Sequence, residues 1–188
     1  MKLSLFIIIG GLLVSSTVNA QTNYTLTQEK SEITIKGTSS LHDWESNAET
    51  ISGLATFQIS DGSLNAVDKL NLTVEVKSIK SGKGIMDSKT HDAFDAKKNP
   101  LITFELGEVT SITADSIFTK GVLTMAGVNN TIDLVGAYSI DENGTLSFSG
   151  SEKLKMTDYK MKPPKAMLGT LKTGDDVEVV FSVAFQTN

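Results

Sequence analysis

The sequence predicts an all-β, antiparallel fold of about eight strands or more. Apolar and polar residues alternate in most runs after residue 21, turn residues separate the runs, and no proline interrupts one. Such alternation is typical of an antiparallel sheet with one wet face. So many short strands predict a closed barrel or a sandwich, and only closure would remove the edge strands. The alternating runs lie within residues 33–35, 51–59, 70–76, 102–106, 123–125, 132–134, 146–148 and 177–185.

Two segments interrupt the strand pattern. Residues 84–98 are expected to form one short helix, because Met86, Thr90 and Phe94 have helical spacing and Pro100 follows. Residues 153–169 are apolar, irregular and interrupted by two prolines, which favours a long loop at the rim of the fold.

The first twenty residues have the three parts of a cleaved signal peptide. Lys2 precedes an uncharged apolar run over 3–14, and the segment ends in small residues at Val18-Asn19-Ala20. The mature chain is then expected to be residues 21–188, which is one domain's length. It has no cysteine. Export without disulfides favours a bacterial envelope protein, either periplasmic or secreted.

The charge of the mature residues argues against several partners. They contain sixteen lysines, no arginine and twenty-two acidic residues, which gives a net charge of −6. An acidic chain without arginine is a poor candidate for nucleic acid or for an anionic-membrane patch. Stable membrane insertion is not expected either, since the apolar run of the signal is too short.

Catalytic motifs are absent from the sequence. It has no Gly-x-Ser-x-Gly, His-Glu-x-x-His or phosphate-binding glycine loop. With two histidines and no cysteine, the usual general bases and nucleophiles are scarce. The sequence therefore predicts a protein that is not an enzyme and has no cofactor.

Short motifs recur in one order along the mature chain. They are Ser78-Ile79 with Gly82, Asp87, Phe94-Asp95, Pro100 with Thr103-Phe104, Gly121-Val122-Leu123-Thr124 with Gly127, Asp158-Tyr159, and Gly174-Asp175 with Val177. In this order and spacing they resemble the YceI-like family of exported, lipocalin-like, polyisoprenoid-binding proteins. The resemblance implies a closed barrel around a long apolar pore that holds an isoprenoid chain such as a quinone tail. It also implies the bacterial periplasm and no catalytic residues.

The chain departs from that family in the polar residues of two segments. The family often has Arg-Asp-x-His in the helical segment, where this sequence reads Met86-Asp87-Ser88-Lys89. It often has an arginine before the Asp-aromatic pair, where Met156 and Thr157 stand here. Headgroup contacts are therefore not carried over to this chain.

The expected ligand is an amphiphilic small molecule of quinone or polyprenyl type in the lumen of the barrel. Methionines suit such a site because their flexible side chains adapt to variable apolar ligands. The residues expected at the pore wall or mouth are Trp44, Phe57, Val74, Phe94, Phe104, Met125, Met156 and Met161.

Other interpretations stay open from the sequence. Trp44 could plug one end of the barrel, with His42 satisfied by its neighbours. The protein could be a structural or interaction domain of the envelope, with a packed interior and a partner at the loop of residues 161–168. It could also handle a metal, because Asp87 and His91 are spaced by four residues, and exported methionine clusters can hold Cu(I). The methionines concerned are Met86, Met125, Met156, Met161 and Met167.

Overall fold

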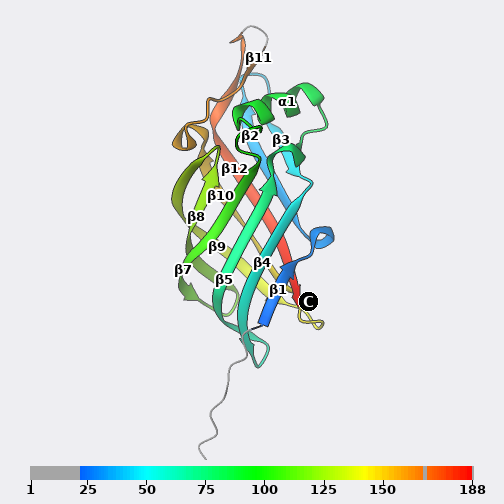
Figure 1. Ribbon diagram of the computed structural model, residues 1–188, viewed down its shortest axis with the longest axis vertical. Helices are drawn as coiled ribbons and strands as arrows, with labels where there is room; N and C mark the ends of the chain where they lie inside the picture. Colours follow the sequence, from blue (N-terminus) through cyan, green and yellow to red (C-terminus); the bar gives the residue numbers. More distant parts are fainter. Residues whose placement is uncertain (1–21, 167–168, 188) are drawn as a thin grey trace, which may run out of the picture.

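The computed structural model describes residues 22–166 and 169–187, so the expected signal peptide and Met167 lie outside the described residues. Strands dominate the fold (Figure 1). Its elements are β1 (Thr22–Leu26), η1 (Gln28–Lys30), β2 (Glu32–Ser39), β3 (Trp44–Ala48), β4 (Ile51–Ser60), β5 (Ser63–Glu75), η2 (Val76–Ser78), β6 (Ile79–Lys80), α1 (Gly84–Ala93), β7 (Leu101–Ile112), β8 (Ser116–Met125), β9 (Val128–Ile140), β10 (Leu146–Lys155), η3 (Met156–Tyr159), β11 (Lys165–Ala166) and β12 (Leu171–Thr187).

Eight of the strands form a closed antiparallel barrel. The ring runs β1-β4-β5-β7-β8-β9-β10-β12, and the pairing of β1 with β12 closes it. Strand β12 spans the length of the barrel, because its residues 173–182 pair with β2 and its residues 185–187 pair with β1. The predicted all-β, lipocalin-like barrel is therefore confirmed.

The two ends of the barrel differ in what covers them. Strands β3 and β6 extend the sheet beyond β2 at one end, where α1 and the hairpin of β11 with β12 also lie (Figure 1). We call this the open end. The opposite end, which we call the closed end, carries the turns at 61–62, 113–115 and 141–145.

Aromatic side chains fill the interior at the closed end. Phe57 is fully buried, and its ring lies within 6 Å of the rings of Tyr24, Phe148 and Phe185. Edge-to-face aromatic contacts add to the stability that comes from burial alone. Side chains thus close this half of the barrel.

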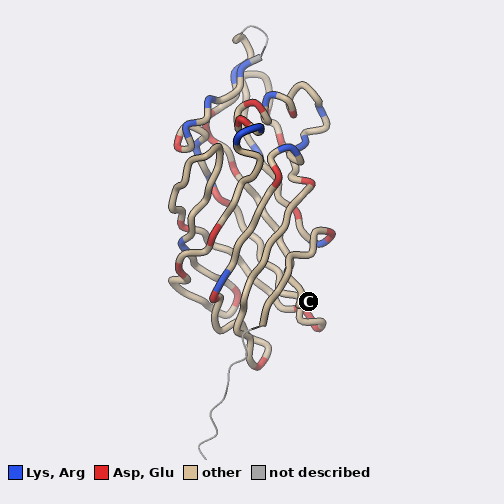
Figure 2. Tube along the Cα trace, viewed as in Figure 1, with Lys and Arg blue, Asp and Glu red and all other residues tan. Residues whose placement is uncertain are grey.

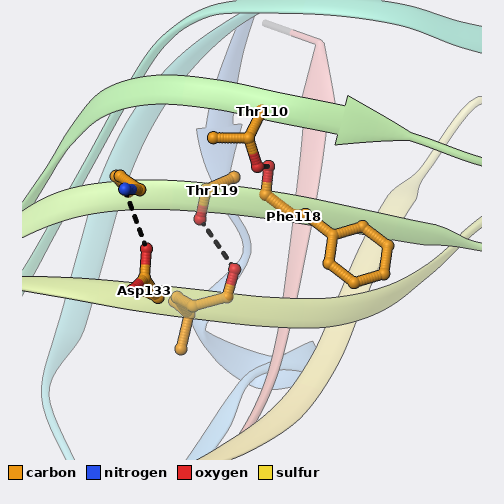
Figure 3. Close-up of polar contacts among 6 residues, drawn as sticks. Thr110, Phe118, Thr119 and Asp133 are labelled. Atoms are coloured by element: carbon orange, nitrogen blue, oxygen red, sulfur yellow. Dashed lines mark hydrogen bonds and ion pairs between the residues drawn. The ribbon is translucent and has the colours of Figure 1, made fainter.

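Polar contacts join neighbouring strands along the wall of β7, β8 and β9 (Figure 3). The Thr110 hydroxyl donates to the Phe118 carbonyl oxygen at 3.1 Å, and the Thr119 hydroxyl donates to the Leu134 carbonyl oxygen at 3.0 Å. The Lys120 Nζ lies 3.7 Å from an Asp133 carboxylate oxygen. These contacts hold the three strands in register on one side of the barrel.

The segments that were expected to break the β pattern do so, over different bounds. The helix ends at Ala93 rather than 98, because turns follow it and the Asn99 side chain donates to the Phe94 carbonyl oxygen at 3.0 Å. Strand β10 runs to Lys155, so the predicted rim loop starts later and contains η3 and β11. No helix among the described residues has the length and apolarity that crossing a membrane requires.

Candidate ligand-binding cavity

A deep cavity of about 670 Å³ occupies the half of the barrel toward the open end. Its wall comes from residues of ten strands and from one side of α1, and most of these residues are aliphatic, aromatic or methionine. Small-molecule sites have volumes of about 300–1,000 Å³ and are mostly apolar. The cavity has both properties. The interior is therefore not packed throughout, whereas the interaction-domain alternative expected a packed interior.

Seven of the eight residues predicted at the pore wall or mouth line this cavity. Strands β5, β7 and β8 supply three of them, and the rest come from β3, the turn after α1, η3 and the rim loop. The seven are Trp44, Val74, Phe94, Phe104, Met125, Met156 and Met161.

Phe57, the eighth, does not line the cavity. It lies on β4, which pairs with β1 at the closed end, and it is 0% exposed among the other aromatic rings. Its alternating, inward-facing position is the same as that of Phe104, but its depth along the barrel differs. Phe57 therefore belongs to the packed end of the core.

Two of the aromatic rings in the wall lie close against glycines on neighbouring strands. The Trp44 ring covers Gly37 on β2, and the Phe104 ring covers Gly121 on β8. A methyl group at either glycine would overlap the ring. The absence of a side chain lets these rings lie along the wall and leaves the lumen open.

Trp44 does not plug the barrel. Its indole nitrogen donates to the Thr38 carbonyl oxygen at 3.0 Å, which fixes the ring at the rim of the cavity. The His42 ring, also at the rim, is exposed, and its Nδ1 lies 2.6 Å from the Asp43 carbonyl oxygen.

The predicted methionines gather on one side of the cavity. Met125, Met156 and Met161 pack with Leu154 and Tyr159 in a core cluster separate from the aromatic one. The buried Tyr159 hydroxyl has no hydrogen-bond partner within the described part of the chain. Flexible thioether side chains next to a cavity let its wall adapt to ligands of different shape.

The helix face with metal-ligand spacing makes structural hydrogen bonds instead. The backbone N–H and the hydroxyl of Ser81 donate to Asp87 Oδ1 at 2.8 and 2.6 Å, and these bonds lower the pKa of that carboxyl. The His91 Nε2 lies 3.1 Å from the Ile79 carbonyl oxygen. Over residues 22–166 and 169–187, no group of three or more His, Cys, Asp or Glu side chains has metal-binding geometry.

Glu152 is the one acidic residue that lines the cavity in the described ranges. It shares the inward face of β10 with Phe148 and Leu154. Strands β9 and β10 pair only from Leu146 to Ser149, so Glu152 lies where the two strands no longer pair. Burial raises the pKa of the Glu152 carboxyl, and the charge of nearby Asp133 raises it further.

Replacing Glu152 with glutamine is expected to stabilise the protein at neutral pH. When the pKa of a carboxyl is higher in the folded than in the unfolded chain, its protonated form favours folding. The free energy of unfolding then falls as pH rises from the unfolded-state pKa to the folded-state pKa, because the carboxyl becomes charged. The advantage of Glu152→Gln over the wild type should therefore be present at pH 7. It should vanish below about pH 4, near the ordinary glutamate pKa. Urea unfolding at several pH values measures this, and a difference that does not change with pH would contradict it.

Part of the cavity wall was not predicted from the sequence. Val177, Val179 and Phe181 of β12 line it, and their alternation signalled an inward face but not the depth of each residue. Ile85 and Lys89 of α1 also line it, although this helix has a thin apolar face and gave no site signal. Their position follows from the place of α1 at the open end.

The fold is similar to that of several solved structures. The chain is similar to Burkholderia cenocepacia BcnA (TM-score 0.68, 19% identity, covering 85% of this chain and 98% of the other). It is also similar to a polyisoprenoid binding domain from Saccharophagus degradans (TM-score 0.70, 16% identity, 88% and 98%). A third similar structure is the Campylobacter jejuni YCEI protein (TM-score 0.60, 24% identity, 76% and 85%). At these identities the likeness establishes the fold alone.

Sequence comparison identifies the family. No curated protein sequence matches the chain. The family model described as the YceI-like domain matches residues 24–185, which include every strand of the barrel and nearly all of the described chain. The protein therefore belongs to the YceI-like family, as the order of its short motifs predicted.

Proposed function

We propose that the protein binds one amphiphile with a long apolar chain, of quinone or polyprenyl type, and sequesters or transports it in the bacterial envelope without catalysing a reaction. The observation that carries this proposal is the apolar cavity of about 670 Å³, which opens at one end of the barrel. Membership of the YceI-like family and likeness to a polyisoprenoid binding domain support it.

Burial of hydrocarbon alone supplies enough free energy for such binding. Each methylene group removed from water contributes about 0.8 kcal/mol. A chain that buries roughly ten methylenes gains about 8 kcal/mol before the costs of association, and a net free energy of that size corresponds to a Kd of about 1 μM. The cavity thus needs no arginine to anchor a headgroup, which agrees with a chain that has none.

Export to the periplasm is part of the proposal. The signal-like first twenty residues and the absence of cysteine support it. In that compartment an amphiphile with a long tail has no soluble form of its own, so a carrier would keep the tail out of water.

Titration with ligands of increasing chain length tests the proposal. Trp44 is the only tryptophan of the chain and lies at the rim of the cavity, so its fluorescence reports occupancy. With a series of prenyl or alkyl alcohols, affinity should increase by at most about fourfold per methylene and then stop increasing when the cavity is full. Affinity that does not depend on chain length, or no binding to any member of the series, would contradict the proposal.

A further inference from the structure

Charge is distributed unevenly along the barrel axis. Residues 40–43, 80–98, 155–166 and 169–176 form most of the open end and contain ten lysines and seven aspartates. The turns of the closed end contain four acidic residues and no lysine (Figure 2). The acidic turn residues are Asp61, Asp115, Asp141 and Glu142. The open end is therefore locally basic in a chain whose net charge is −5.

The lysines of the open end are mostly unpaired. Within the described residues, Lys98 and Lys155 are the two of the ten that form ion pairs, with Asp95 and Asp176. The exposed Lys83, Lys89 and Lys165 line the mouth of the cavity. Some acids at this end are already engaged, since Asp87 accepts hydrogen bonds from Ser81 and Asp175 accepts two from Thr157.

Two large aliphatic side chains stand in water at the same rim. Ile85, in the first turn of α1, is 80% exposed, and Leu41, in the loop between β2 and β3, is 71% exposed. They are the two most exposed large apolar residues of the described chain. The Leu41 loop is fixed to the start of β12, because the Ser40 N–H donates to the Lys172 carbonyl oxygen at 2.9 Å. Ile85 lines the cavity mouth, and so does His42, which follows Leu41 in the sequence.

We infer that the open end docks on the surface of an anionic phospholipid bilayer, with Leu41 and Ile85 entering the boundary between headgroups and acyl chains. Apolar side chains flanked by lysines suit this boundary, because the aliphatic groups leave water while the ammonium groups stay among the phosphates. The charge of the rim favours an anionic surface over a neutral one. Docked in this way, the cavity mouth opens onto the bilayer in which an amphiphile resides, so the inference extends the proposed function to how the cargo is exchanged.

Vesicle flotation tests the inference with the purified protein. The vesicles are phosphatidylcholine alone or phosphatidylcholine with about one third phosphatidylglycerol, each at low and at physiological salt. We expect binding to the anionic vesicles, weakened by salt because exposed charges are screened. Equal binding to both vesicle types, or no binding to either, would overturn the inference. Capture of an acidic protein without any vesicle binding would also overturn it.

Matched variants locate the docking surface. Leu41→Ser with Ile85→Ser, and separately Lys83→Glu with Lys89→Glu and Lys165→Glu, should each weaken vesicle binding at least tenfold. The controls are Leu54→Ser and Lys69→Glu, which change an exposed leucine and an exposed lysine on β4 and β5. Rim variants that bind vesicles as tightly as these controls would contradict the inference.

Ligand loading in vesicle-free solution separates the two proposals. Leu41→Ser alone, at an exposed residue that does not line the cavity, should still load a prenyl ligand, and a variant with a blocked cavity should still bind anionic vesicles. If the wild-type protein loads no prenyl ligand but binds anionic vesicles, the proposed function is rejected and the docking inference stands. The opposite result would reject the docking inference alone.

Discussion

Replacing Val179 with tryptophan is expected to weaken ligand binding about fifty-fold. Val179 lines the cavity from the middle of β12, where it pairs with Glu152 on one side and Ile35 on the other. An indole there fills space that a ligand chain would use. Displacing three methylenes of that chain loses about 2.4 kcal/mol of burial, which is about fifty-fold in Kd. Isothermal titration calorimetry with the same series of alcohols measures the change, because the added indole would mix with the fluorescence of Trp44.

Val180→Trp is the matched control for this variant. Val180 is the next residue of the same strand, faces the other side of the sheet, and does not line the cavity. It should bind ligand as the wild type does, and circular dichroism checks that both variants fold. If Val179→Trp binds as tightly as Val180→Trp, the ligand is held elsewhere than in the cavity.

Truncation of Phe57 to alanine is expected to lower the free energy of unfolding by about 3–5 kcal/mol, the usual cost of removing a buried aromatic side chain. Phe57 is 0% exposed and contacts the rings of Tyr24, Phe148 and Phe185. The loss combines burial, aromatic contacts and the cavity that remains. Urea unfolding of wild type and variant at pH 7 measures it.

Leu54→Ala provides the comparison on the same strand. Leu54 is 60% exposed, so its truncation should change stability by less than about 0.5 kcal/mol. The folded Phe57→Ala protein should keep its affinity for ligand, because Phe57 lies outside the cavity. A large loss of affinity in folded Phe57→Ala protein would show that the two halves of the barrel are coupled.

The sequence predicted most strands because their apolar residues alternate. Strands β1 and β3 were missed, since each is five residues long and has few large apolar side chains. In β3 the inward positions after Trp44 are Ser46 and Ala48, both buried. Small or polar residues on an inward face give no hydrophobic signal. These positions were therefore recognisable only from the structure.

The alternation of apolar and polar residues could not predict how deep in the barrel each inward-facing residue lies. Phe57 and Phe104 both occupy inward positions, yet one fills the closed end and the other lines the cavity. Depth depends on which strands pair and in which register, and these are relations between distant segments. The family resemblance supplied the barrel, but the register of β4 with β1 decided the place of Phe57.

The overall composition also does not reveal how charged residues are distributed over the molecule. An acidic chain without arginine argued against contact with an anionic surface, and that argument applies to the molecule as a whole. The fold brings two lysine-rich segments, separated by more than fifty residues in the sequence, to the same end of the barrel. A local basic surface thus arises from topology and not from net charge.

The most direct test of a ligand in the cavity is native mass spectrometry of the protein purified from the cells that produce it, followed by organic extraction and analysis of the extract. We predict a bound species with a long apolar chain, of quinone or polyprenyl mass, in a one-to-one complex. A clean mass of the protein alone, retained after incubation with prenyl lipids, would contradict it.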